Sequence, residues 1–143
     1  MEKDTKKEEE YLNGWKRERA DFLNYKKDEM ERIGQLVKYS NEELILNIMP
    51  ILDNFYLAEK HLPENKEFAS GFTQIKKQLE DFLKKEGIEP IKTFGEKFDP
   101  NLMEVVEEIE TKEKESGVVI EETQKGYTLH GKMIRVAKVR VTK

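Results

Sequence analysis

The chain has 143 residues and a formal net charge of −4, and 39% of its residues are charged against 36% that are hydrophobic. This balance is typical of long solvated helices rather than of one thick hydrophobic core. The chain has no cysteine, which excludes disulfides, thiolate chemistry and cysteine-ligated zinc.

The N-terminal segment 1–10 alternates positive and negative charges, and after the initial methionine its first apolar neighbour is Tyr11. We expect this segment to be a disordered tail. It contains no apolar stretch of the secretory type. The longest apolar run, 44–52, is interrupted by Asn47 and Pro50 and is far shorter than the ~20 residues that cross a membrane. We therefore expect a soluble, cytoplasmic protein.

One long helix is predicted from about Glu8 to His61, because apolar side chains recur every eleven residues along its stalk segment, 11–61. Eleven residues make three turns of about 3.67 residues, so the stripe follows a nearly straight α-helix. The helix would be roughly 75 Å long. The rest of the chain is too short to cover such a stripe, so a second copy of the helix should cover it in a parallel homodimer. The most regular column consists of Tyr11, Phe22, Ile33, Leu44 and Phe55.

The lower part of this helix should have more than one neighbour. Around Pro50 the apolar columns widen to include Ile48, Leu52 and Phe55, which favours a helix bundle. Pro50 itself lacks a backbone donor and would clash with the carbonyl group of the preceding turn, so we expect a kink near 46–50. The columns further up contain Arg19, Lys26, Gly34 and Asn41 and should pack less well.

A second helix is predicted within the segment 62–87, after a turn at 62–65. Its apolar residues lie three and four positions apart, and Gly87 is placed to end it. Two such helices from each of two chains would form a four-helix bundle. Gly71 lies in the middle of this helix, where glycine costs about 1 kcal/mol relative to alanine. Either the close approach of a neighbouring helix or simple tolerance would explain it.

The remaining segment, 88–143, is predicted to be a small β head, which makes the fold class α+β. Glycine and proline separate short β-type runs, and a hairpin is expected to turn at His130 and Gly131. The last run has apolar residues of both parities, which either a bulge or burial on both faces would explain. The predicted strands are 103–109, 118–123, 127–129 and 133–141.

Residues suited to catalysis are scarce. The only histidines are His61 and His130, at a helix end and in a turn, and we expect both to be solvated. The three serines lack a neighbouring Asp or His, and no glycine-rich phosphate loop follows a strand. The acidic run 107–110 is best explained as a charged strand edge. We therefore expect a protein that is not an enzyme and has neither a cofactor nor a metal site.

Charge is unevenly distributed in the head. The segment 104–122 has eight Glu and two Lys, whereas 125–143 has six Lys or Arg and no acidic residue. A basic hairpin can bind nucleic acid, but Tyr127 is the single aromatic residue there. Two further interpretations are a sheet whose halves attract each other and a surface for an acidic protein partner.

Five motifs, in order along the chain, resemble the GrpE family, the nucleotide exchange factors of DnaK-type chaperone ATPases. They are Asn-Tyr-Lys-Lys at 24–27, Met-Pro-Ile-Leu-Asp-Asn at 49–54, Phe-Asp-Pro-Asn-Leu at 98–102, Gln-Lys-Gly-Tyr-Thr-Leu at 124–129 and Ile-Arg with Ala-Lys-Val at 134–139. The chain departs from the family pattern at four positions. Met103 stands where His is usual, Val136 where Pro is common, Lys138 where an apolar residue is common, and Lys132 where Arg is frequent.

The resemblance implies a homodimer without enzymatic activity that binds the ATPase domain of a DnaK-type chaperone, opens its nucleotide cleft and accelerates ADP release. Family contact positions fall on Lys26 and Lys27 in the stalk and on Phe98, Val106, Thr123, Lys132 and Val141 in the head. The expected dimer interface comprises Phe22, Ile33, Val37, Leu44, Ile48, Leu52, Phe55, Gly71, Phe72, Ile75 and Leu79.

Two of the head positions carry a specific expectation. Lys132 should be exposed and unpaired within the head, because its segment has no acidic residue, and Val141 should present a small apolar anchor near the chain end. The alternative functions are a coiled-coil scaffold and a nucleic-acid-binding protein that uses the basic C-terminal hairpin. No nucleic acid and no membrane is expected among the partners.

Overall fold

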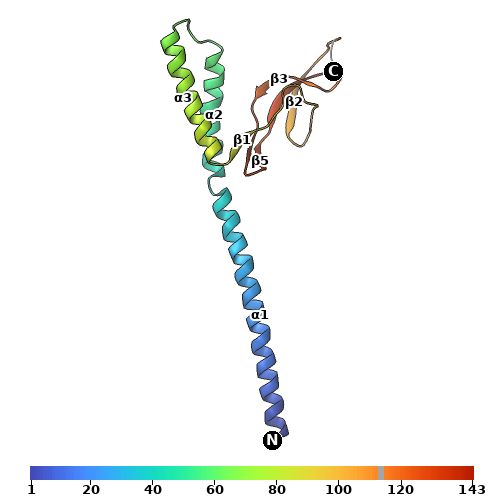
Figure 1. The fold of residues 1–143 in the computed structure, drawn as a ribbon. Coiled ribbons are helices and arrows are strands. Elements are labelled where there is room, and N and C mark those ends of the chain that lie inside the picture. The colour runs from blue at the N-terminus through green and yellow to red at the C-terminus, as the bar shows by residue number, and fades with distance from the viewer. Residues whose placement is uncertain (113–114) are drawn as a thin grey trace. The chain divides into compact units, whose positions relative to one another are not determined.

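The computed structural model describes residues 1–112 and 115–143. The chain forms two compact units, Met1–Ser40 and Asn41–Lys143. The first unit is the single helix α1, Glu2–Tyr39, and the second holds two helices and the strands (Figure 1). The predicted α+β fold class is confirmed.

Helix α1 begins at Glu2, so the segment 1–10, expected to be a disordered tail, is helical. Acidic side chains of its first turn and Lys38 in its last turn favour the helix, because they complement the partial charges at its ends. None of the residues of α1 is buried within the chain.

The long predicted helix is interrupted at Ser40 and Asn41, and helix α2 runs from there over Glu42–Glu59. Helix α2 itself continues through Pro50, near which we expect a kink. The physical reason for the interruption is local. The hydroxyl of Ser40 donates to the carbonyl of Val37 at 3.1 Å, and Asn41, a residue that favours the N-terminal cap, has a non-helical backbone.

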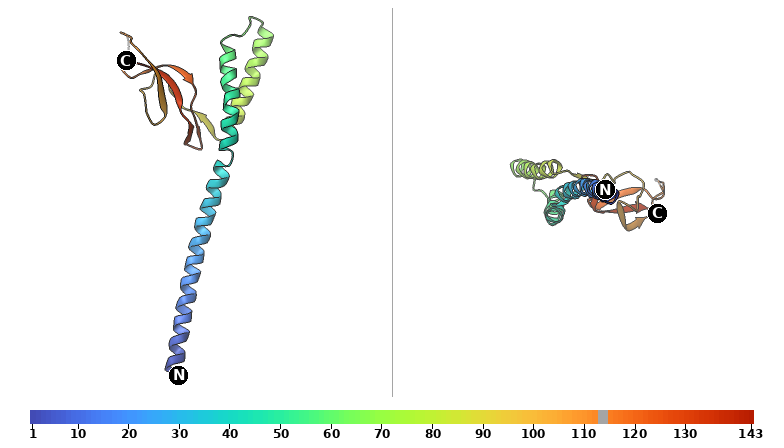
Figure 2. Two further views of the ribbon diagram at one scale, coloured as in Figure 1. Left: turned by 180° about the vertical axis from the view of Figure 1, so that it is seen from behind. Right: turned by 90° about the horizontal axis from the view of Figure 1, so that it is seen from below.

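Helix α3, Lys66–Lys85, lies beside α2 (Figure 2). Its start is capped by the side chain of Asn65, which accepts from the amide of Glu67 at 3.0 Å. Its end is followed by Gly87 with φ +85°, as the sequence predicts. Buried residues from both helices and from the segment that follows α3 form the core between the helices and the head, namely Ile45, Met49, Leu52, Leu83 and Ile88.

The β head consists of two three-stranded sheets. In the first, β4 (Tyr127–Leu129) pairs antiparallel with β1 (Ile88–Pro90) and β5 (Lys132–Arg135). In the second, β6 (Ala137–Thr142) is central, parallel to β2 (Met103–Ile109) and antiparallel to β3 (Val119–Gln124). A cluster of Met103, Val119, Ala137, Val139 and Val141 forms the core of the second sheet.

The predicted hairpin is confirmed. His130 and Gly131 connect β4 to β5 with φ of 49° and 85°, the conformation of a two-residue turn. The predicted strand 133–141, however, is two strands that belong to different sheets and meet at Val136. This change from one sheet to the other explains why apolar residues of both parities occur in the segment. It also requires Gly126, because a Cβ atom there would lie 2.4 Å from the amide nitrogen of Ala137.

Candidate functional site

Two of the predicted contact residues, Val106 and Thr123, lie at irregularities of the strands on either side of β6. The register between β2 and β6 shifts between Val105 and Glu107, which leaves Val106 unpaired and 47% exposed. Thr123 lies at a similar shift in β3, and its hydroxyl donates to the carbonyl of Lys138 at 3.1 Å. At each of these two register shifts, a residue without a cross-strand partner has an exposed side chain.

The charges on this sheet largely satisfy one another. Arg140 on the central strand lies 3.1 Å from Glu107 of β2 and 2.8 Å from Glu121 of β3. Two lysines of the basic segment pair with acidic residues of the acidic one, Lys143 with Glu110 and Lys125 with Glu122. Of the three interpretations of the uneven charge, the structure favours the one in which the two halves of the head attract each other.

The expectation that Val141 presents an anchor is wrong. Its side chain is only 4% exposed and belongs to the head core, because β6 is the central strand and Ala137, Val139 and Val141 share its inner face. Phe98 is half-buried and packs against the same cluster. Val141 therefore supports the surface from below, whereas Phe98 keeps part of its side chain exposed.

Lys132 is exposed, as expected, and it forms an ion pair with a residue outside the head. Its ammonium group lies 3.6 Å from a carboxylate oxygen of Glu42 on α2, and its side chain remains 57% exposed. The expectation took account of the acidic residues of the head alone, whereas the partner comes from a helix ninety residues earlier in the chain.

In α1, both predicted contact lysines are exposed. Lys26 and Lys27 line a hollow on the helix surface together with Leu23, Met30 and Glu31. The apolar ends of Leu23 and Met30 lie between cationic side chains, which suits a partner surface that combines apolar and acidic groups.

The predicted dimer residues differ in exposure, from fully exposed through half-buried to buried. Exposed apolar side chains remain on all three helices. Among the described residues, no atom outside the adjacent helical turns would lie within 4 Å of a Cβ atom added at Gly71, so no neighbour in this described part explains the glycine. Leu52, in contrast, is 1% exposed and has no surface left for a second copy, so its assignment to the interface is wrong. Phe55 and Phe72 are half-buried and pair with each other, with ring centroids 5.3 Å apart. The exposed members are Phe22, Ile33, Val37, Leu44 and Ile75, and Ile48 and Leu79 are half-buried.

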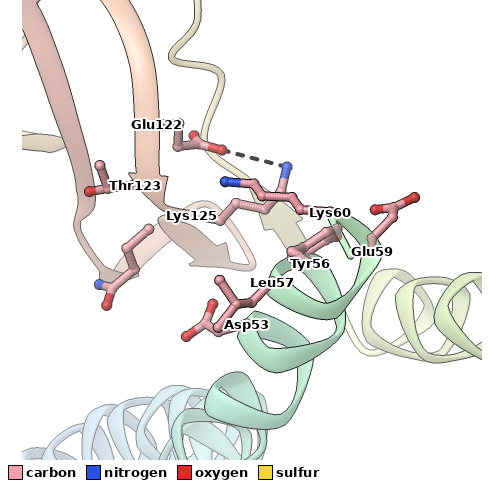
Figure 3. Close-up of a pocket in the computed structure, with 9 residues that line it drawn as sticks. Asp53, Tyr56, Leu57, Glu59, Lys60, Glu122, Thr123 and Lys125 are labelled. Atoms are coloured by element: carbon pink, nitrogen blue, oxygen red, sulfur yellow. Dashed lines mark ion pairs between the residues drawn. The ribbon is translucent and has the colours of Figure 1, made fainter. Parts of the chain in front are cut away.

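A junction between α2 and the head lies next to Thr123. A cleft of about 380 Å³ separates them, with Asp53 and Tyr56 on the side of α2 and Thr123 and Lys125 on the side of the head (Figure 3). The guanidinium of Arg135 makes two hydrogen bonds to Asp53, at 2.7 and 2.8 Å. Thr123 therefore joins the exposed surface to this junction.

Two tyrosines complete the junction. Tyr56 donates to Glu80 of α3 at 2.7 Å, and the ammonium group of Lys125 lies 4.8 Å from the centre of its ring. Burial, followed by the hydrogen bond to Glu80, raises the pKa of Tyr56 well above its usual range. Burial also raises the pKa of Tyr127 to about 12. Both phenols are therefore neutral at physiological pH, which suits a structural role.

The junction was not predicted as a site, although the sequence holds a signal for it. Asp53, Lys125, Tyr127 and Arg135 all belong to the motifs that carry the resemblance, but each was assigned only to its motif. In the described residues, no group of three or more His, Asp or Glu side chains could hold a metal ion. No helix in this described part is both long and apolar enough to cross a membrane.

Comparison with known proteins identifies the chain's relatives. The GrpE family model matches residues 1–143. The chain is 41% identical over 137 residues to Protein GrpE of Oceanobacillus iheyensis, covering 94% of this chain and 72% of that protein. It is 38% identical over 135 residues to Protein GrpE of Methanobrevibacter smithii, with coverage of 94% and 73%. Protein GrpE of Bacillus subtilis is 37% identical over 136 residues, with coverage of 93% and 73%.

Proposed function

The chain belongs to the GrpE family, and on that premise we propose that it is a nucleotide exchange factor. It binds the ATPase domain of a DnaK-type chaperone in the cytoplasm, opens the nucleotide cleft and accelerates the release of ADP. The family match over residues 1–143 is the observation that carries this proposal. We propose that the protein accelerates ADP release without enzymatic activity of its own, in keeping with the scarcity of catalytic groups in the sequence.

The mechanism we propose is a shift of population. A protein that binds the open form of the ATPase domain more tightly than the closed form moves the equilibrium toward the open form. Because the open form holds ADP weakly, the nucleotide leaves. The exposed Val106 and Thr123 in the head and Lys26 and Lys27 in α1 would supply the contacts.

We further propose that the active form is a parallel homodimer. None of the apolar side chains of α1 is buried in the single chain, and α2 and α3 also keep exposed apolar residues such as Leu44 and Ile75. Exposed apolar stripes of this extent are typical of surfaces that another protein covers. A second copy offers the same stripe with the same eleven-residue spacing.

The test is the release of a fluorescent ADP analogue from a DnaK-type ATPase, chased with excess unlabelled nucleotide. The dissociation rate should rise with the concentration of this protein and reach a plateau. A rate that stays unchanged at saturating protein contradicts the proposed function. Phosphate release by this protein alone would contradict its assignment as a non-enzyme.

A further inference from the structure

One contact that joins the β head to α2 is the ion pair of Asp53 and Arg135. Two parallel hydrogen bonds, Nη1 to Oδ2 at 2.7 Å and Nη2 to Oδ1 at 2.8 Å, link residues 82 positions apart in the sequence. The Arg135 side chain is only 15% exposed, so solvent screens the pair weakly. A two-bond guanidinium–carboxylate pair fixes both distance and orientation.

Arg135 is itself held from the side of the head. Its Nε and Nη2 atoms donate to the carbonyl of Lys125 at 3.0 and 2.6 Å, and its guanidinium lies 5.2 Å from the centre of the Tyr127 ring. Because these contacts fix the guanidinium to the head, a rotation of the head would move it away from Asp53. The orientation of the head on α2 and the geometry of this ion pair depend on each other.

Apart from the buried apolar residues between the helices and the head, the other attachments are weaker. The chain passes from α3 to the head once, through a short connection in which Gly87 adopts φ +85°. A second ion pair between α2 and the head joins Glu42 to Lys132 at 3.6 Å, with the lysine exposed. Small contact areas between parts of a chain allow relative motion unless specific contacts prevent it.

We propose that Asp53 and Arg135 are positioning residues that hold the β head at one orientation on α2. They thereby keep the exposed contact residues of the head, Val106 and Thr123, in the orientation that binds the partner. This inference rests on the proposed function. Val106 and Thr123 must meet the partner together with contacts from the helices, so a head that samples many orientations binds only while it is in the correct one. The apparent affinity then falls by the fraction of time spent there.

The test combines a distance measurement with the exchange assay on the whole chain of 143 residues. Because the chain has no cysteine, two can be introduced for nitroxide labels, at Glu64 beyond the end of α2 and at Lys97 in the head. Labelled protein is diluted with an excess of unlabelled protein so that distances within one chain dominate. The wild-type protein should give one narrow distance distribution. Asp53→Asn, which keeps the size but removes the charge, should broaden it.

In the exchange assay, Asp53→Asn should raise the protein concentration for half-maximal acceleration about tenfold, as expected if the correct orientation is populated about a tenth of the time. The plateau rate should stay unchanged, because a correctly oriented head still acts normally. Arg135→Lys keeps the charge but loses the paired geometry, so it should shift the curve in the same direction by less. Circular dichroism at the assay temperature verifies that each variant is folded.

Glu42→Gln is the matched control, since it also removes a carboxylate of α2 that pairs with the head. It should leave the distance distribution narrow. The double variant Asp53→Arg with Arg135→Asp should recover part of the narrow distribution, because it restores the attraction with reversed charges.

An Asp53→Asn distribution as narrow as that of the wild type overturns the proposal. A broad distribution with an unchanged half-maximal concentration overturns the positioning role. If the wild-type protein itself fails to accelerate ADP release, the proposed function is wrong and the positioning role falls with it. The distance distributions distinguish this case, because they report on the ion pair without any partner.

Discussion

Helix α1 and the unit Asn41–Lys143 differ in where their apolar side chains lie. The second unit buries its own core, including Met49 and Val139, within the single chain. Helix α1 buries none of its residues and leaves Tyr11, Trp15 and Phe22 in solvent. Since a helix in a protein gains most of its stability from packing, the proposed dimer would supply the packing that α1 lacks in the single chain, whereas the other unit packs against itself.

The largest predicted effect is the loss of stability of the second unit when a charge is placed in its core. Val141→Asp places a carboxylate in the head core and should cost about 4 kcal/mol or more of the free energy of unfolding. Urea unfolding followed by the circular dichroism of the β head measures this loss. A variant that retains wild-type stability would show that Val141 is accessible to solvent after all.

A matched pair of leucines compares the two units directly. Leu52→Ala should destabilise the second unit by about 2–5 kcal/mol, because Leu52 is fully buried. Leu36→Ala on α1 makes the same chemical change at an exposed position outside the eleven-residue columns, and should change stability by less than about 0.5 kcal/mol. Chemical denaturation of both variants tests the comparison, and equal losses would contradict it.

Heating should separate the units. Helix α1 should melt first, and its midpoint should rise with protein concentration, because its stability depends on association. The transition of Asn41–Lys143 should come later and depend less on concentration. Circular dichroism at several concentrations, together with light scattering for a mass about twice that of the 16.9 kDa chain, measures both points. A single concentration-independent transition of a monomer would refute the account of α1.

The smallest effect concerns an exposed position. Lys132→Glu replaces the attraction to Glu42 with a repulsion and should cost less than about 1 kcal/mol, since the lysine is largely exposed. If the partner surface is acidic, the same change should slow association with the chaperone more than it speeds dissociation. Binding kinetics at two salt concentrations measure this, with Lys92→Glu as a control elsewhere in the exposed head. An unchanged association rate would remove Lys132 from the interface.

Local patterns in the sequence predicted the local structure well. The strands Met103–Ile109 and Tyr127–Leu129 and the turn at His130 and Gly131 follow from alternation and turn-forming residues, and the structure confirms them. The interruption at Ser40 was missed because the apolar columns continue through it. A side chain that competes for a helical carbonyl leaves no mark on the hydrophobic pattern.

Local sequence patterns do not predict contacts between segments that are far apart in the chain. The pairing of Asp53 with Arg135 and of Glu42 with Lys132 depends on how the head sits on α2, which no spacing in the sequence encodes. The burial of Val141 depends on β6 being the central strand, and the order of strands in a sheet is likewise a property of the tertiary fold. The motifs nevertheless held part of the answer, because several of their residues meet at the junction.

The most direct test of the proposed function is the reciprocity of nucleotide and protein binding. If this chain lowers the affinity of the chaperone for ADP by some factor, ADP must lower the affinity of the chaperone for this chain by the same factor. Calorimetric titration of the nucleotide-free and the ADP-saturated ATPase domain measures the second factor, and ADP titration with and without this chain measures the first. The account predicts two equal factors well above one. Equal affinity of this chain for the nucleotide-free and the ADP-bound domain would contradict it.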